Sequence, residues 1–175
     1  MPWNLQTMEK MHRPGSALLR VSVRRQRLEL WLGGRRVKTY RISTAANGVG
    51  GRENSFQTPP GLHRVVRWIG AGRPAGAVFK SRRFTGEVVP PTKWRDPAGP
   101  ERILTRILRL RGCEPGVNAG PGCDSYSRYI YIHGTNREQD LGRPASRGCI
   151  RMGNRDVIDL FNRTRGRPTW CVIES

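Results

Sequence analysis

The chain has 175 residues, with 32 Lys and Arg against 13 Asp and Glu, which gives a formal net charge of +19. A hydrophobic content of 36%, together with 21 Gly and 13 Pro, predicts one loop-rich, mainly β domain and argues against a helical bundle. No apolar run approaches the roughly 20 residues that a membrane helix needs, so we expect no integral membrane segment.

The basic residues are dispersed along the chain, and only four of the 32 are Lys. They form no basic zipper or RNP-like strand, and the sequence has no zinc-finger spacing. We therefore interpret the charge as a generally basic surface that suits anionic envelope polymers, and we expect no nucleic-acid partner.

The sequence divides into a flexible N-terminal leader, residues 1–16, and one domain, residues 17–175. The leader has no apolar stretch typical of a secretory signal, so the sequence leaves the export route open. Alternating apolar residues then predict strands. Their ranges are 18–23, 27–32, 35–43, 62–68, 103–110, 129–132 and 170–173, with short candidates near 78–79 and 87–89. Gly33-Gly34, between the second and third ranges, predicts a β-hairpin.

One principal helix is predicted, and it begins at Asn154. Asn154 is a suitable N-cap, and Asp156 in the first turn complements the helix dipole. Residues 157–161 supply apolar side chains at helical spacing, and Gly166 can end the helix.

The four cysteines indicate different environments. Cys113 and Cys123 flank a loop rich in Gly and Pro, where either a disulfide or two free thiols would fit. Cys171 lies in the apolar run 170–173 and is expected in the core. The cysteine spacing does not suit zinc, and no metal is expected.

The most informative pair is His133, which follows the strand 129–132, and Cys149, which comes sixteen positions later. A thiol is a strong nucleophile as thiolate, and a neighbouring imidazole is a common activator. Gly148 allows a tight turn whose backbone N–H groups can face a substrate carbonyl, as an oxyanion hole requires. Ser146 can hydrogen-bond within this turn or fix the imidazole. The pattern therefore predicts cysteine-dependent acyl transfer.

The segments His-Gly-Thr-Asn (133–136) and Ser-Arg-Gly-Cys-Ile-Arg-Met (146–152), followed by Asn154, resemble the signature of the L,D-transpeptidase catalytic domain, called YkuD-like. Thr-Pro-Pro-Gly (58–61) resembles another motif of that family, and the resemblance extends over residues 18–173. Arg147 stands where many members have a second histidine. His133 is therefore the better candidate for the base.

The resemblance implies a β-sandwich of mixed sheets with one principal helix after the cysteine, and a lid drawn from residues 70–100. It implies that Cys149 attacks a tetrapeptide stem of peptidoglycan, releases D-Ala and forms a thioester. The thioester can then react with three kinds of acceptor. An amine on another stem gives a 3→3 cross-link, water gives carboxypeptidase activity, and a free D-amino acid replaces the released D-Ala in an exchange reaction. No cofactor is implied, and carbapenems are expected to add to the cysteine.

By the same resemblance, Cys149 is the nucleophile, His133 the general base and acid, and Gly148 part of the oxyanion hole. Arg151 either organises the turn or holds a substrate carboxylate through a bidentate pair. The remaining residues expected around the substrate are Ser146, Arg147, Thr135 and Tyr131.

Two other classes of function stay open. One is an antibacterial effector that uses the same thiol as a carboxypeptidase or exchange enzyme on a rival's cell wall. The other is a basic binding module that keeps the fold without catalysis. For the enzyme we expect a monomer in the cell envelope whose partners are peptidoglycan stem peptides.

Overall fold

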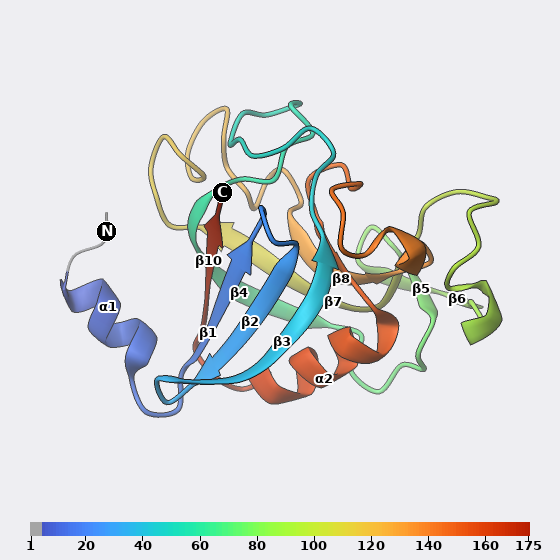
Figure 1. Cartoon of the computed structure of the whole chain (residues 1–175), viewed down its shortest axis with the longest axis horizontal. Helices are drawn as coiled ribbons and strands as arrows, with labels where there is room; N and C mark the ends of the chain where they lie inside the picture. Colours follow the sequence, from blue (N-terminus) through green and yellow to red (C-terminus); the bar gives the residue numbers. More distant parts are fainter. Residues whose placement is uncertain (1–4) are drawn as a thin grey trace.

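The computed structural model describes residues 5–175 and contains ten strands and two α-helices in that range (Figure 1). The N-terminal half contains α1 (Leu5–His12), β1 (Ala17–Ser22), β2 (Arg27–Leu32), β3 (Arg35–Ser43), β4 (Gly61–Ile69), β5 (Ala77–Lys80) and β6 (Arg83–Val88). The remainder contains η1 (Pro91–Lys93), β7 (Ile103–Gly112), β8 (Tyr131–Thr135), η2 (Glu138–Asp140), β9 (Ile150–Met152), α2 (Asn154–Thr164) and β10 (Thr169–Glu174), where η marks a 3-10 helix.

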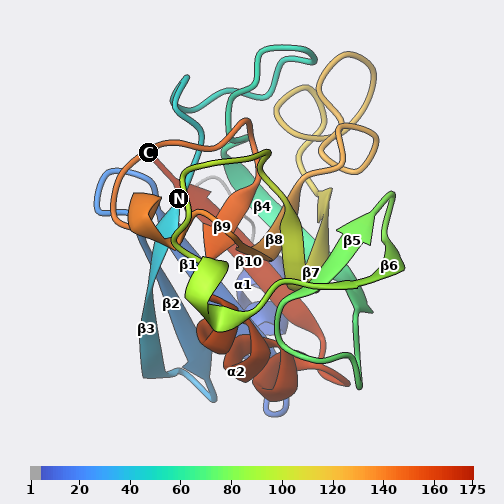
Figure 2. The same ribbon diagram turned by 90° about the vertical axis from the view of Figure 1, so that its right-hand side faces the viewer.

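The strands form one mixed sheet in the order β4-β10-β1-β2-β3-β9-β8-β7-β5-β6. An additional pairing of β4 with β7 joins two distant members of this order, so hydrogen bonding runs continuously around the core. Figure 1 shows β1, β2 and β3 in one layer with β4 behind them. The β5–β6 hairpin continues outward from β7, as Figure 2 shows from the side.

The main core lies between these layers and is closed by α2. Every strand from β1 to β4 and from β7 to β10 contributes buried apolar side chains, and α2 contributes Val157, Leu160 and Phe161. Tyr40 of β3 donates a hydrogen bond to Asp159 of α2 at 2.7 Å, which fixes the helix to the sheet. This burial makes β8 and β9, which carry the signature residues, a rigid part of the molecule.

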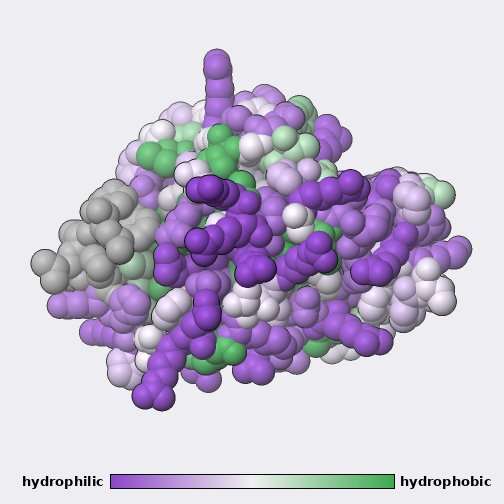
Figure 3. All heavy atoms as spheres, viewed as in Figure 1, coloured by the Kyte–Doolittle hydropathy of each residue, from purple (hydrophilic) through white to green (hydrophobic). Residues whose placement is uncertain are grey.

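The predicted fold class is confirmed, since the structure is mainly β with one main helix, α2. The predicted hairpin is present as β2 and β3, and Gly33 and Gly34 both have positive φ, as a tight hairpin turn requires. Figure 3 shows hydrophilic side chains over most of the face that carries β1, β2 and β3. No helix among residues 5–175 is both long enough and apolar enough to span a bilayer.

Two details of the predicted elements differ. Residues 5–12 of the expected leader form helix α1, whose Met11 is buried against Leu18 and Val172, while residues 1–4 lie outside the described residues. Asn154 is the first residue of α2 rather than its N-cap, which is Gly153. Its side chain is bonded to Thr135 and Glu138 instead.

Candidate active site

The signature residues meet because β8 and β9 run parallel in one register. His133 is the Cα partner of Arg151, and Ile132 is the partner of Ile150. Paired residues of neighbouring strands project to the same face of a sheet, so His133 and Arg151 share a face, and Cys149 lies two residues before Arg151 in the bend that leads into β9. The register therefore places the strand that carries His133 beside the strand that follows Cys149.

His133 lies inside β8, with only 2% of its surface exposed, not at the strand's end as the sequence suggested. Its Nδ1 donates to the Gly134 carbonyl at 2.7 Å, because a carbonyl oxygen can only accept. Burial lowers the pKa of His133, with Glu101 opposing and Arg151 adding to that effect. The neutral ring therefore keeps a lone pair on Nε2, the form that a general base needs.

Cys149 immediately precedes β9 and is half-buried beside Tyr131 and Phe79. Its thiol donates to the Tyr129 carbonyl at 3.4 Å. Burial raises the pKa of the thiol to about 11. A hydrogen bond from the Tyr131 backbone and the charges of Arg151 and Arg128 act in the opposite direction and lower this pKa. The resting pair is thus a neutral thiol and a neutral imidazole.

No hydrogen bond within residues 5–175 joins the His133 ring to the Cys149 sulfur. The charges of Glu101 and Arg151 nevertheless act on both groups, which places them in one electrostatic environment.

The turn before Cys149 is held by hydroxyl groups. Ser146 Oγ donates to the Cys149 carbonyl at 2.6 Å and accepts the Gly148 N–H at 3.3 Å, so it acts within the turn. Gly148 has φ of +125°, which favours glycine. Thr58 Oγ1 donates to the Gly148 carbonyl at 3.0 Å from a fully buried position. The Cys149 N–H makes no hydrogen bond among the described residues, and it is the free donor beside the sulfur.

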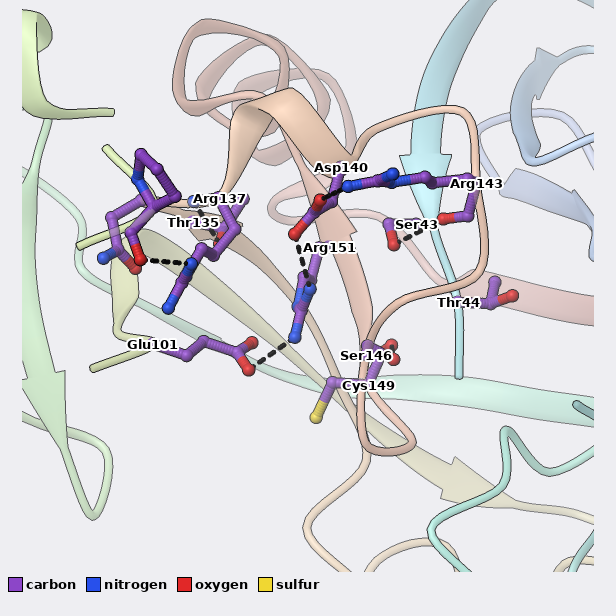
Figure 4. Close-up of polar contacts among 12 residues, drawn as sticks. Ser43, Thr44, Glu101, Thr135, Arg137, Asp140, Arg143, Ser146, Cys149 and Arg151 are labelled. Atoms are coloured by element: carbon purple, nitrogen blue, oxygen red, sulfur yellow. Dashed lines mark hydrogen bonds and ion pairs between the residues drawn. The ribbon is translucent and has the colours of Figure 1, made fainter. Parts of the chain in front are cut away.

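Arg151 is 3% exposed and lies between two carboxylates, Glu101 and Asp140 (Figure 4). Its Nη2 is bonded to Glu101, and its Nη1 is 3.8 Å from Asp140. Glu101 lies in the loop just before β7, whereas Asp140 is the last residue of η2. Arg151 therefore connects two loops beneath the site, which favours the organising role over the substrate-binding one.

The other expected site residues occupy distinct positions. Thr135 is fully buried, and its Oγ1 accepts the Arg137 N–H at 3.0 Å. Arg147 is exposed, and its guanidinium lies 4.6 Å from the centre of the Phe56 ring. Tyr131 is buried directly beside Cys149. Of these three residues, Tyr131 contacts the nucleophile.

Several residues at the site were not anticipated from sequence. Arg128 donates to the carbonyls of Gly51 at 2.7 Å and Gln57 at 2.8 Å, and it holds the glycine-rich loop near the thiol. Glu101 acts electrostatically on both central residues. The family-like motif at 58–61 was a usable signal for Thr58, but neither Arg128 nor Glu101 stands in a recognisable pattern.

The cysteines outside the site are free thiols, so Cys113 and Cys123 are not joined in this structure. Cys171 is fully buried in the core, as predicted, and burial raises its pKa. Within residues 5–175, no group of three or more His, Cys, Asp or Glu side chains gathers as a metal site would require.

Comparison with known proteins gives a consistent result. The model of the L,D-transpeptidase catalytic domain family (YkuD) matches residues 16–173. The chain is 51% identical over 66 residues to YkuD of Bacillus licheniformis, to which L,D-transpeptidase activity is provisionally assigned. This alignment covers 34% of the chain and 40% of that protein, so the chain spans about two fifths of the relative's length.

Solved structures share the fold at low sequence identity. An L,D-transpeptidase (residues 123–326) from Xylanimonas cellulosilytica aligns with a TM-score of 0.56 and 16% identity over 93% of this chain and 62% of that one. L,D-transpeptidase 3 from Mycobacterium tuberculosis, solved with a faropenem-derived adduct, aligns with a TM-score of 0.54 and 15% identity, over 91% and 60% of the two chains.

Proposed function

Because the chain belongs to the L,D-transpeptidase catalytic domain family, which its residues 16–173 match, we propose that it transfers acyl groups between peptidoglycan stem peptides, with Cys149 as nucleophile. The observation that supports the proposal is the pairing of His133 with Arg151 across the parallel strands β8 and β9, because Cys149 precedes Arg151 by two residues and the charges of Glu101 and Arg151 act on both the imidazole and the thiol. The substrate assigns the enzyme to the cell envelope.

In the first half-reaction, His133 Nε2 takes the thiol proton as the sulfur attacks the carbonyl carbon of the residue before the terminal D-Ala. The tetrahedral intermediate collapses with cleavage of the C–N bond, and the imidazolium returns the proton to the departing amine. D-Ala leaves, and a thioester remains on Cys149.

In the second half-reaction, an acceptor attacks the thioester carbonyl. His133 takes a proton from the acceptor and returns it to the sulfur as the C–S bond breaks. An amine on another stem gives a cross-link, and water gives a shortened stem. Both half-reactions place negative charge on the carbonyl oxygen, and the free Cys149 N–H is the proposed donor to it. A well-placed donor of this kind contributes about 3 kcal/mol.

The test is incubation of the reduced protein with purified disaccharide-tetrapeptide, followed by mass analysis of the products. Loss of D-Ala with dimer formation supports transpeptidation, and loss with addition of water supports carboxypeptidase activity. An unchanged substrate contradicts the proposal, provided that the protein is folded and its thiol reacts with a small alkylating agent.

A further inference from the structure

Arginine and tyrosine side chains alternate along one flank of the Cys149 site. We call this set the Arg–Tyr row. It consists of Arg82, Tyr131, Tyr129, Arg109, Tyr126 and Arg111. The row begins at the tip of the β5–β6 hairpin and continues over β7, the segment before β8 and the first residue of β8. The reaction steps described above use none of these six side chains.

The contacts within the row are cation–π and polar. Arg82 Nη1 donates to the Tyr131 hydroxyl at 3.2 Å, and its guanidinium lies 5.0 Å from the centre of the Tyr129 ring. Arg109 lies 3.5 Å from the Tyr126 ring and 5.6 Å from the Tyr129 ring. Stacking of this kind holds each guanidinium plane in a fixed orientation.

The row is joined directly to the nucleophile. The Tyr129 carbonyl accepts the thiol of Cys149 at 3.4 Å, and the Tyr131 backbone bonds to the same sulfur. Tyr129 has φ of +56°, an unusual value for a bulky residue, and it is 53% exposed. Tyr129, on whose ring the Arg82 guanidinium lies, therefore contacts the sulfur through its backbone and presents its ring to solvent.

The charges in the row have no counter-ions within the described part of the chain. No salt bridge there involves Arg82, Arg109 or Arg111, whereas the nearby Arg151 pairs with two carboxylates. Arg109 is 6% exposed, and its Nε has no hydrogen-bond partner. Arg82 remains half-buried, so it can pair with an anion from outside. An Arg without a carboxylate partner beside a nucleophile suits an anionic substrate group.

The hairpin turn that presents Arg82 is strained. Lys80 pairs with Arg83, which leaves Ser81 and Arg82 as the two turn residues, with φ of +49° and +67°. Such turns favour Asn and Gly at both positions, and a long side chain there is unfavourable. Strain retained at a turn that contacts the site points to a functional reason for the side chain.

We propose that Arg82, oriented by Tyr129 and Tyr131, binds a carboxylate of the acyl-donor stem peptide. This inference rests on the proposed function and names the group that the site recognises. A stem tetrapeptide offers two kinds of carboxylate, the terminal one on D-Ala and those on its side branches. Both would accept a bidentate pair from the guanidinium, and the donors described below distinguish them.

The experiment compares Arg82→Ala and Arg82→Lys with Arg83→Ala in the full chain. Arg83 is the matched control because it adjoins Arg82 in the chain, is exposed, and its side chain makes no hydrogen bond, salt bridge or cation–π contact among the described residues. With an unmodified tetrapeptide, Arg82→Ala should raise KM for D-Ala release by about 10- to 100-fold, the size of a lost charge-assisted hydrogen bond, with a smaller effect on kcat. Arg82→Lys should be intermediate, since it keeps charge but loses the planar fork. Arg83→Ala should stay within about twofold.

Two amidated donors identify the carboxylate, one amidated at the terminus and one at the side branches. With one of these donors, Arg82→Ala should no longer raise KM relative to the wild type, because the wild type then also lacks the pair between Arg82 and the carboxylate. If Arg82→Ala raises KM with both amidated donors, or if it lowers only kcat and the melting temperature, then Arg82 only holds the hairpin. Either result would overturn the inference.

Binding separates this inference from the proposed function. Tetrapeptide affinity is measured by calorimetry in Cys149→Ala with and without Arg82→Ala, where no turnover is needed. At least about tenfold weaker binding in the double variant supports carboxylate recognition even if the wild type releases no D-Ala. Equal affinities overturn the inference while leaving acyl transfer untouched.

Discussion

His133 and Arg151 are direct partners across the parallel strands β8 and β9. Arg151 is in turn held by Glu101 and Asp140, which come from two different loops. The strand that carries the base is thus placed against the strand that follows the nucleophile, and both are fixed to the loops beneath the site. The proposed chemistry depends on this placement, and the predictions below test it.

The pH dependence of activity should reflect a buried neutral imidazole. Burial lowers the pKa of His133, so its basic form persists below the usual value of 6.5, and activity is lost only as pH falls through the lower value in the folded protein. We expect the acidic limb of kcat/KM to have its midpoint below pH 6.5. His133→Asn should reduce kcat by about 10²–10⁴-fold. A limb centred above 6.5 would contradict a desolvated base.

Ser146 should matter for catalysis through the shape of the turn. Ser146→Ala removes the hydrogen bonds to the Cys149 carbonyl and the Gly148 N–H, a loss of about 1–3 kcal/mol, or roughly 5- to 150-fold in kcat/KM. Ser127→Ala is the control, because Ser127 makes a similar bond to the Asp124 carbonyl outside the turn. Equal effects of the two variants, measured by D-Ala release, would show that the Ser146 contacts are unimportant.

Stability should fall in mild acid because of His63. This ring is fully buried between the Gly61 carbonyl and Ser125 Oγ, and burial lowers its pKa to about 4. A lowered pKa stabilises the folded state above the unfolded value of 6.5, and that stability is lost as pH falls toward 4.

Urea unfolding at pH 7.5 and 4.5 measures this contribution. Between pH 7.5 and 4.5, the free energy of unfolding should fall by about 2–3 kcal/mol less in His63→Gln than in the wild type. In His12→Gln, where the replaced side chain is exposed, the fall should match that of the wild type. If the fall is the same in all three proteins, His63 does not control acid stability.

A carbapenem should acylate the protein at Cys149. The sulfur is half-buried and free, and its chemistry toward a β-lactam carbonyl is that of the first half-reaction. Intact mass should rise by one carbapenem in the wild type and not in Cys149→Ser. An adduct that persists in the variant would place the reactive group elsewhere.

Much of the site was predictable because its central residues are adjacent in sequence. His133 and Cys149 were identified from local strings, and alternation located most strands. Glu101, Arg128 and Arg82 were not identified, because long loops and a strained hairpin bring them to the site, and nothing local encodes where such segments return. Helix α1 was missed for a similar reason, since it rests on the burial of Met11 by distant strands.

Asn154 shows how tertiary contacts override a local preference. Its type and place suited an N-cap, yet its side chain accepts from Thr105 at 2.6 Å and donates to the Thr135 carbonyl at 2.7 Å. Thr105 itself has φ of +72°, a value rare for a β-branched residue, at an irregularity of the β7 ladder. A buried polar network between β7, β8 and α2 therefore determines the position of Asn154.

Intact-protein mass spectrometry during turnover of a disaccharide-tetrapeptide tests whether Cys149 forms the proposed thioester. We expect a transient mass gain on Cys149 equal to the donor minus D-Ala, located by peptide mapping and absent from Cys149→Ala. Release of D-Ala by Cys149→Ala at the wild-type rate, with no covalent species in either protein, would contradict this expectation.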